Sequence, residues 1–169
     1  MDFNTAFERL IDSEGGYTDD PNDGGNWTGG RQGAGVLKGT KFGIAANTYP
    51  LLDIKGLTVE QAKAIYRRDF WDVLGNARPS ITFQVFDFAV NSGIGTAIRK
   101  LQDAIGVADD GQWGPLSAAA LEQMDENDVL LRLIGLRLEF MSKLKAFDVY
   151  GRGWSRRIAK NLLYAAQDN

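Results

Sequence analysis

The chain opens with a helix signal in residues 3–17, which read FNTAFERLIDSEGGY. Four apolar residues recur there at the spacing of one helical face: Phe3, Phe7, Leu10 and Ile11. Glu14 continues this face, and the glycines after it predict the end of the helix. The stretch therefore predicts an amphipathic helix that carries a carboxyl group on its apolar stripe, near its carboxyl end.

The position of Glu14 favours a raised side-chain pKa. Partial burial disfavours the charged carboxylate, and the negative end of the helix dipole acts in the same direction. A carboxyl group that stays protonated near neutral pH can protonate the leaving oxygen of a glycoside. From the spacing alone, the alternative is that Glu14 is exposed at a frayed helix end or is paired with an arginine.

Residues 17–50 are rich in glycine and in turn-forming residues. This composition predicts loops, with a short hairpin around residues 36–44. A loop region of this length inside a domain is usually functional or disordered. Asp19, Asp20 and Asp23 lie on it, and one of them could face Glu14 across a cleft and orient a water, whereas the alternative is that they only stabilise turns. We expect Tyr17 in this cleft, where its ring can stack on a sugar.

The remainder of the chain predicts helices. Thr58 and Gln61 form a capping-box pattern, and Pro115 suits a first helical position. The expected helices cover residues 58–74, 80–91 with Ser80 as the cap, 95–105, 115–124, a long helix from the cap Asn127 to about residue 141, and 154–166. The pattern predicts a mostly helical α+β fold, in which a glycine-rich N-terminal lobe with a short β-hairpin packs against a helical body.

Composition narrows the chemistry. The 169 residues contain no cysteine and no histidine, which excludes disulfides, thiolate nucleophiles, Ser-His-Asp triads and the usual zinc sites. Asp, Glu, Lys and Tyr remain for acid–base catalysis. Among cell-wall enzymes, peptidases and amidases mostly need His or Cys, whereas glycosidases need only carboxyl groups. If the substrate is cell wall, composition therefore favours a glycosidase over a peptidase, and a site without His and Cys is expected to use no metal and no cofactor.

Charge and hydropathy argue against two classes of partner. The net charge is −3, and the glycine-rich region contains no phosphate-binding motif, so we expect no nucleic-acid partner. No apolar stretch approaches the ~18 residues of a membrane span, so we expect no membrane insertion.

Ordered motifs extend from Glu14 almost to the end of the chain. They are Glu14-Gly15-Gly16-Tyr17, Asp20-Pro21, Asp23, Gly39-Thr40, Gly43-Ile44, Thr48-Tyr49, IYRRDFW (65–71), FDFAVNSG (86–93), Leu101-Gln102, Gly106-Val107, Asp110-Gly111, Gly114-Pro115 and GRGWSRR (151–157). In this order they resemble glycoside hydrolase family 108, the N-acetylmuramidases found mostly as phage endolysins and prophage lysis proteins. The resemblance covers nearly the whole chain and implies a lysozyme-like fold.

The resemblance implies Glu14 as the catalytic acid. Asp23 and Thr40 then hold the attacking water, or Asp23 stabilises the oxocarbenium-like transition state. Family members usually run straight from the glycine pair into the threonine, whereas residues 26–39 separate them here. Thr28 is therefore an alternative to Thr40, and the insertion is a candidate lid or flap. Substrate contacts are expected from the following residues: Tyr17, Asp20, Tyr49, Asp87 and Asn91.

The expected reaction is hydrolysis of the β-1,4 bond between N-acetylmuramic acid and N-acetylglucosamine, for bacterial cell lysis. We expect one domain of residues 1–169, with a catalytic part at 1–92 and a helical part at 93–169 that holds the family's predicted peptidoglycan-binding segment. The alternatives are a lytic transglycosylase and a non-catalytic peptidoglycan-binding or secretion-accessory module. The retaining or inverting outcome is left open.

The setting of the reaction is also an expectation. The first residues show no signal-peptide pattern. We expect a monomer that is made in the host cytoplasm, acts on peptidoglycan glycan strands in the periplasm or cell wall, and reaches them through holin-dependent release.

Overall fold

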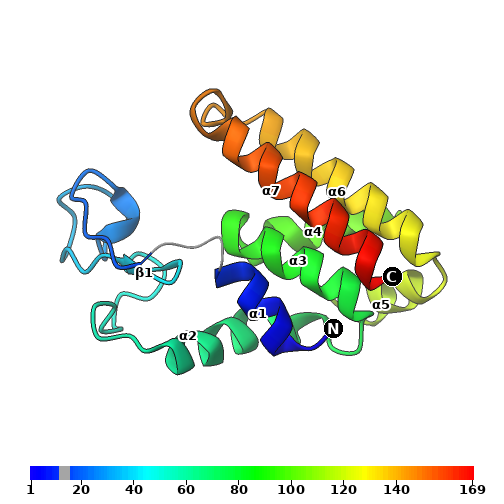
Figure 1. Cartoon of the computed structure of the whole chain (residues 1–169), viewed down its shortest axis with the longest axis horizontal. Coiled ribbons are helices and arrows are strands. Elements are labelled where there is room, and N and C mark those ends of the chain that lie inside the picture. Colours follow the sequence, from blue (N-terminus) through cyan, green and yellow to red (C-terminus); the bar gives the residue numbers. More distant parts are fainter. Residues whose placement is uncertain (12–15) are drawn as a thin grey trace. The chain divides into compact units, whose positions relative to one another are not determined.

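Helices dominate the fold, and the described residues, 1–11 and 16–169, contain one two-stranded antiparallel sheet (Figure 1). In this computed structural model the main elements are α1 (Phe3–Ile11), β1 (Thr40–Lys41), β2 (Ile44–Ala45), α2 (Val59–Tyr66), α3 (Pro79–Ser92), α4 (Ile94–Ile105), α5 (Pro115–Glu122), α6 (Glu126–Ser142) and α7 (Phe147–Asp168). Short 3₁₀ turns cover Gly24–Asn26 and Asp72–Leu74, and a π-helical turn covers Arg67–Trp71. The predicted mostly helical α+β class is confirmed.

The chain divides into two units, Phe3–Asp69 and Phe70–Asn169, and Met1–Asp2 groups with the second. We call them the N-terminal and the C-terminal unit. The predicted single domain with parts at 1–92 and 93–169 stays a prediction. Over the described residues, no helix has both the length and the apolar character that crossing a bilayer requires.

The hairpin of the N-terminal unit turns within two residues. β1 and β2 pair with Lys41 opposite Ile44, so Phe42 and Gly43 form the turn. Both have positive φ, 53° and 76°, which matches the twist of a two-residue hairpin turn. Glycine adopts this conformation freely, whereas Phe42 needs support from its surroundings. The predicted hairpin is therefore present, over residues 40–45 and not 36–44.

Tyr66 supplies that support and joins the hairpin to the helices. Its hydroxyl donates to the Phe42 carbonyl oxygen at 2.7 Å, and its ring centre lies 5.9 Å from that of Phe7 on α1. α2 begins as predicted, with a capping box in which the side chains of Thr58 and Gln61 each bond the other's backbone N–H. One buried tyrosine thereby connects α1, α2 and the hairpin turn.

α3 is the central helix of the C-terminal unit. Its residues 80–89 are all buried, and it packs against α4, α6 and α7. Burial on every side explains why apolar residues occur around this helix and not along one face alone. Figure 1 shows α6 and α7 side by side as an antiparallel pair. The shared core includes Val85, Phe88, Leu101, Leu133 and Ile158.

Two of the predicted helix caps are wrong. α3 begins at Pro79, and the hydroxyl of Ser80 donates to the Glu126 carboxylate and does not cap the helix. Proline at the first helical position lacks only an N–H that has no intrahelical partner, so it suits this start. α6 is capped by Asp125, which accepts a backbone N–H at 3.2 Å, and not by Asn127. The predicted start of α5 at Pro115 is confirmed.

The last helix begins earlier than predicted. α7 starts at Phe147 and not at Trp154. The added turns contain Gly151, which permits close packing. A Cβ at Gly151 would lie 2.8 Å from the Phe147 ring, so the absence of a side chain lets this ring lie against the helix.

Asp87 joins the helices of the C-terminal unit through a buried ionic cluster. Its carboxylate on α3 accepts from Arg137 Nη1 at 2.7 Å, from Arg157 Nη2 at 2.8 Å and from Asn161 Nδ2 at 2.6 Å. The side chains of Asp87 and Arg137 are 4% and 2% exposed. Burial alone would raise the pKa of Asp87, but the positive charges of the two arginines outweigh it and lower the pKa to about 2. The cluster therefore ties α3 to α6 and α7.

Asp87→Asn should destabilise the protein by about 3–5 kcal/mol, because it leaves Arg137 buried without its counter-charge. Denaturant unfolding followed by circular dichroism measures this loss. In the wild type, the contribution of Asp87 is complete above its unfolded pKa of about 4 and is lost as the pH falls toward 2. Glu139→Gln, at an exposed carboxylate on α6, is the control and should change stability by less than about 0.5 kcal/mol. Equal losses in the two variants would contradict the structural role of Asp87.

Candidate active site

Glu14, the predicted acid, lies outside the residues that the structure describes. Tyr17 is the first described candidate after it. Its hydroxyl lies 3.3 Å from the Lys38 carbonyl oxygen and 3.4 Å from Asp19 Oδ2, and it can donate to either. Burial and the Asp19 carboxylate raise the pKa of this hydroxyl. The ammonium group of Lys55 lies 5.7 Å from the ring centre.

Thr18 and Thr40 pair through their backbones. The Thr18 N–H donates to the Thr40 carbonyl oxygen at 2.9 Å, and the Thr40 N–H donates to that of Thr18 at 2.8 Å. Gly39 lies beside the pair with φ of 84°, and a Cβ there would lie 2.4 Å from the Thr18 carbonyl oxygen and 2.7 Å from the Tyr17 ring. Only glycine fits this position. The pairing places the Thr40 backbone beside a residue that follows Glu14 by four positions.

Asn26 organises the loop and was not singled out from the sequence. Its Oδ1 accepts from Thr40 Oγ1 at 2.7 Å, and its Nδ2 donates to the Asp20 carbonyl oxygen at 3.0 Å. Its backbone carbonyl accepts from the N–H groups of Lys38 and Gly39 at 2.9 and 3.0 Å. The residue is 0% exposed. One buried amide therefore positions both the Asp20 turn and the strand of Thr40.

Asp20 and Asp23 are the two ends of one turn. The Asp23 N–H donates to the Asp20 carbonyl oxygen at 3.2 Å, and Asp20 Oδ1 accepts from the Asn22 N–H at 2.9 Å. Asp23 Oδ1 accepts from the Gly25 N–H at 2.9 Å and so caps the following 3₁₀ turn. Both carboxylates are exposed. Their turn-forming bonds use one oxygen each, and no described residue donates to Asp23 Oδ2.

The structure places the two candidate threonines in different surroundings. Thr28 Oγ1 accepts from the Val36 N–H at 2.9 Å, and the Thr28 N–H donates to the Val36 carbonyl oxygen at 3.0 Å. These bonds, with the bridge between Trp27 and Leu37, fold the insertion back on itself. Thr40 lies outside this loop and bonds Asn26. Of the two, it is Thr40 that is joined to the turn of Asp20 and Asp23.

Tyr49 belongs to a polar group at the end of α2. Its hydroxyl donates to Asp69 Oδ2 at 2.7 Å, and Arg68 Nη2 donates to the same oxygen at 2.7 Å. The bonds from Arg68 lower the pKa of Asp69, and burial with the Asp69 carboxylate raises that of Tyr49. Asp69 lies in the π-helical turn, a feature frequent at functional sites. The sequence signal for Asp69 is its place in the IYRRDFW motif.

The remaining candidates, Asp87 and Asn91, lie in the C-terminal unit. The contacts of Asp87 with the buried Arg137 and Asn161 and the partly buried Arg157 support a structural role. Asn91 is exposed, and its Nδ2 donates to the Asp87 carbonyl oxygen at 2.8 Å. Their assignment as substrate contacts stays a prediction, as do the roles of the other site residues.

In the described part of the site, the buried Asn26 joins the strand of the Thr40 hydroxyl to the turn of the Asp23 carboxylate. Thr40 donates its hydroxyl hydrogen to Asn26, so its oxygen can still accept from a water. Asp23 Oδ2 can accept in the same way. Orienting a water beside an acidic carboxyl group is the chemistry of glycoside hydrolysis. Over residues 1–11 and 16–169, no three Asp or Glu side chains gather closely enough to hold a metal ion.

Comparison with known proteins identifies the class. The sequence profile described as glycosyl hydrolase 108 matches residues 7–93, just over half of the chain. The protein therefore belongs to glycosyl hydrolase family 108. Its structure is similar to that of SagA from Brucella abortus, with a TM-score of 0.82 and 28% sequence identity, over 98% of this chain and 94% of that chain. Comparison with curated proteins gave no match.

Membership of this family confirms the predicted enzyme class. The protein is a glycoside hydrolase, an N-acetylmuramidase, and its substrate is peptidoglycan. The structural similarity agrees with the predicted lysozyme-like fold. The matched residues include every candidate site residue, from Glu14 to Asn91.

Asn26→Ala should lower the free energy of unfolding by about 1–3 kcal/mol, because it removes a buried amide and leaves the partly buried Thr40 hydroxyl and the Asp20 carbonyl each without a partner. The activity of the variant on peptidoglycan should also be lower than that of the wild type, even at a temperature at which the variant is fully folded. Asn22→Ala, at an exposed residue of the same turn, is the control and should change stability by less than about 0.5 kcal/mol. Full activity in folded Asn26→Ala would show that the hydrogen bonds of Asn26 are not needed to position the active-site residues.

Proposed function

We propose that the chain hydrolyses the β-1,4 bond between N-acetylmuramic acid and N-acetylglucosamine, with Glu14 as the general acid. The observation that carries this proposal is the bonding of Asn26 to both Thr40 and the Asp20 turn. It joins the groups suited to holding a water, and the pairing of Thr18 with Thr40 links them to the segment that follows Glu14.

In the proposed mechanism, Glu14 protonates the bridging oxygen while water attacks the anomeric carbon. Thr40 Oγ1 and Asp23 Oδ2 accept hydrogen bonds from this water and the Asp23 carboxylate takes up the proton that it loses, or Asp23 stabilises the positive charge that develops on the sugar. Thr40 is preferred to Thr28 for this role, because Thr28 Oγ1 is engaged within the insertion. Water attack distinguishes this reaction from that of a lytic transglycosylase, in which a hydroxyl of the substrate attacks.

Tyr17, Asp20 and Tyr49 are proposed as substrate contacts. Tyr17 presents a half-buried ring held at its hydroxyl end, which suits stacking on a sugar face. Tyr49 is anchored by Asp69, so its ring is held in one orientation. The turn bonds of Asp20 use only its Oδ1, so its Oδ2 can contact the substrate.

The biological setting is a further part of the proposal. The enzyme acts in bacterial cell lysis as a monomer, is made in the host cytoplasm and is released to the wall through a holin. Support for this setting comes from the resemblance of the motifs to those of phage endolysins.

Glu14→Gln should lower the rate of peptidoglycan clearance by roughly 10²–10⁴-fold, because glutamine keeps the size of the side chain but cannot act as a proton donor. Loss of turbidity of purified peptidoglycan measures the rate, and circular dichroism checks that the variant is folded. Glu8→Gln provides the matched control, since Glu8 is an exposed glutamate of α1, and it should clear at the wild-type rate.

Wild-type clearance by folded Glu14→Gln would refute the assignment of the acid. The carboxyl groups to examine next would be those of Asp20, Asp23 and Asp87.

A further inference from the structure

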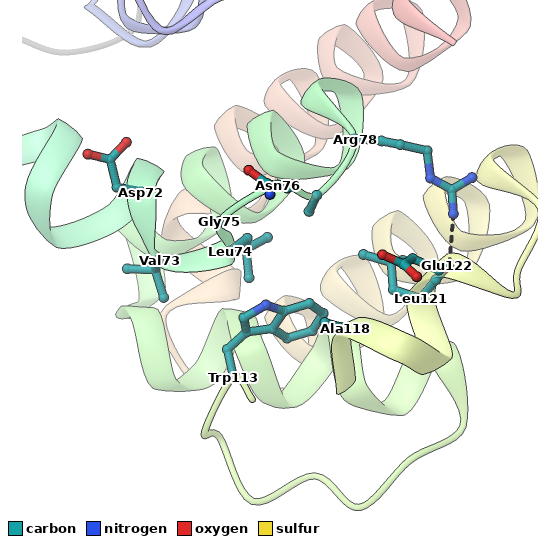
Figure 2. A pocket seen from close by; sticks show the side chains of 11 residues that line it. Asp72, Val73, Leu74, Gly75, Asn76, Arg78, Trp113, Ala118, Leu121 and Glu122 are labelled. Carbon is teal, nitrogen blue, oxygen red and sulfur yellow. Dashed lines mark hydrogen bonds between the residues drawn. The ribbon is translucent and has the colours of Figure 1, made fainter. Parts of the chain in front are cut away.

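Two pockets of the protein differ in their lining and in their place in the chain. One lies in the C-terminal unit, between the segment of Gly75 and Asn76 and the start of α5, with the Trp113 indole across it (Figure 2). Part of its lining belongs to the helical part at 93–169, for which the family resemblance already implies peptidoglycan binding. The other, which we call the N-terminal pocket, has a volume of about 450 Å³ and contains none of the predicted site residues.

The N-terminal pocket is lined by the loop of residues 51–57 and by one face of α2. Leu51, Leu52 and Leu57 come from the loop, and Ala64 and Ile65 come from the helix. Leu51 is 96% exposed, so its side chain contributes little to the packing of the fold. An exposed leucine beside other apolar side chains is typical of a binding surface. None of the described lining residues is aromatic, so the pocket suits alkyl groups better than the face of a sugar ring.

Contacts within the N-terminal unit place this loop beside Tyr17. Lys38 Nζ donates to the Leu52 carbonyl oxygen at 3.3 Å, and the Lys38 carbonyl oxygen lies 3.3 Å from the Tyr17 hydroxyl. The Lys55 ammonium lies 5.7 Å from the centre of the Tyr17 ring. The Asp53 carboxylate adds to the effects of burial and Asp19 that raise the pKa of the Tyr17 hydroxyl. The pocket is therefore next to the residue that we propose stacks on a sugar.

Charged and polar groups of both kinds border the apolar lining. The Lys55 side chain is exposed and forms no ion pair with the part of the chain that the structure describes. Lys41 Nζ donates to the Lys55 carbonyl oxygen at 3.0 Å, which brings a second ammonium group to the loop. Asp53 uses Oδ1 to accept from the Gly56 N–H at 3.1 Å, so Oδ2 can accept from a ligand. The Gln61 side chain accepts from the backbone of Thr58 through Oε1, and its NH₂ group can donate to a ligand.

We propose that the N-terminal pocket binds the short acidic peptide that N-acetylmuramic acid carries on its lactyl group. This inference rests on the proposed function, because it takes Tyr17 to contact the sugar of the same polymer. The peptide combines alanine methyl groups, which fit the leucine and isoleucine lining, with carboxylates that fit the Lys55 ammonium and N–H groups that fit Asp53. Since sugar and peptide are covalently joined, binding of one favours binding of the other. The enzyme should therefore prefer glycan strands that keep their peptides to strands from which the peptides have been removed.

The direct test titrates the full chain with the free peptide N-acetyl-L-alanyl-γ-D-glutamyl-L-lysine, whose acetyl group replaces the lactyl group. Nuclear magnetic resonance should show saturable shifts of the backbone amide signals of residues 51–57. The shifts should be the same in wild type and in Glu14→Gln, because binding of the peptide needs no catalysis. Failure of this inference and failure of the Glu14 assignment are therefore separate results.

Two exposed side chains test the two parts of the pocket without disturbing the core. Leu51→Ser should weaken binding of the peptide by about threefold to tenfold, because it removes apolar surface that the ligand covers. Lys55→Gln should weaken it by about twofold to fivefold, the effect of one exposed ion pair, and this loss should shrink as the salt concentration rises. Leu163→Ser and Lys145→Gln, at an exposed leucine and an exposed lysine of the C-terminal unit, are the matched controls and should leave the affinity unchanged.

A second measurement compares the rates on peptide-bearing strands and on strands stripped by an amidase. The ratio of the two rates should be above one in the wild type and in Leu163→Ser, and lower in Leu51→Ser. An equal ratio in wild type and Leu51→Ser would overturn the proposal, as would amide signals of residues 51–57 that the peptide does not shift. Equal binding of N-acetyl-trialanine amide, which has no carboxylate, would also overturn it, by showing that the pocket takes any apolar peptide segment.

Discussion

The side-chain amide of Asn26 is the constraint on which the candidate active site depends. The segment between Tyr17 and Pro50 has little regular secondary structure, so its backbone groups must find partners outside helices and sheets. Asn26 supplies several of them from one buried position: its carbonyl side accepts from Thr40, and its amide side donates to the Asp20 turn. Gly39 completes the arrangement, because its lack of a side chain allows the strand of Thr40 to reach Thr18. A glycine-rich loop can in this way hold the candidate site residues in fixed positions.

The C-terminal unit depends on a different kind of polar burial. Asp87 is surrounded by two arginines and an asparagine from α6 and α7. A buried ion pair contributes little net stability compared with an apolar replacement, but its partial removal is costly. Because Asp87 lies on the central helix, the cluster fixes how α6 and α7 pack against α3. The same unit holds Gln102, whose bonds set the loop of Trp113.

Local patterns in the sequence predicted the elements well where local physics decides them. The capping box at Thr58 and the proline start of α5 were correct because both act within one helical turn. The predicted start of α7 was wrong, and the turns that it missed are stabilised by the packing of Phe147 on Gly151, which no local pattern reveals. Asn26 and the partners of Asp87 escaped prediction for a related reason. The bond of Asn26 to Thr40 spans 14 positions and the bonds to the Asp87 carboxylate span 50 to 74, and no local pattern marks them.

We propose that water, oriented beside Glu14, cleaves the bond after N-acetylmuramic acid. The most direct measurement is digestion of purified peptidoglycan in water labelled with heavy oxygen, followed by mass spectrometry of the soluble fragments. Hydrolysis by water attack should give fragments that end in reducing N-acetylmuramic acid and carry one heavy oxygen atom at that end. Anhydro-muramic ends without the label would show a lytic transglycosylase, and labelled N-acetylglucosamine ends would show cleavage of the other glycosidic bond. Either result would contradict hydrolysis of the bond after N-acetylmuramic acid.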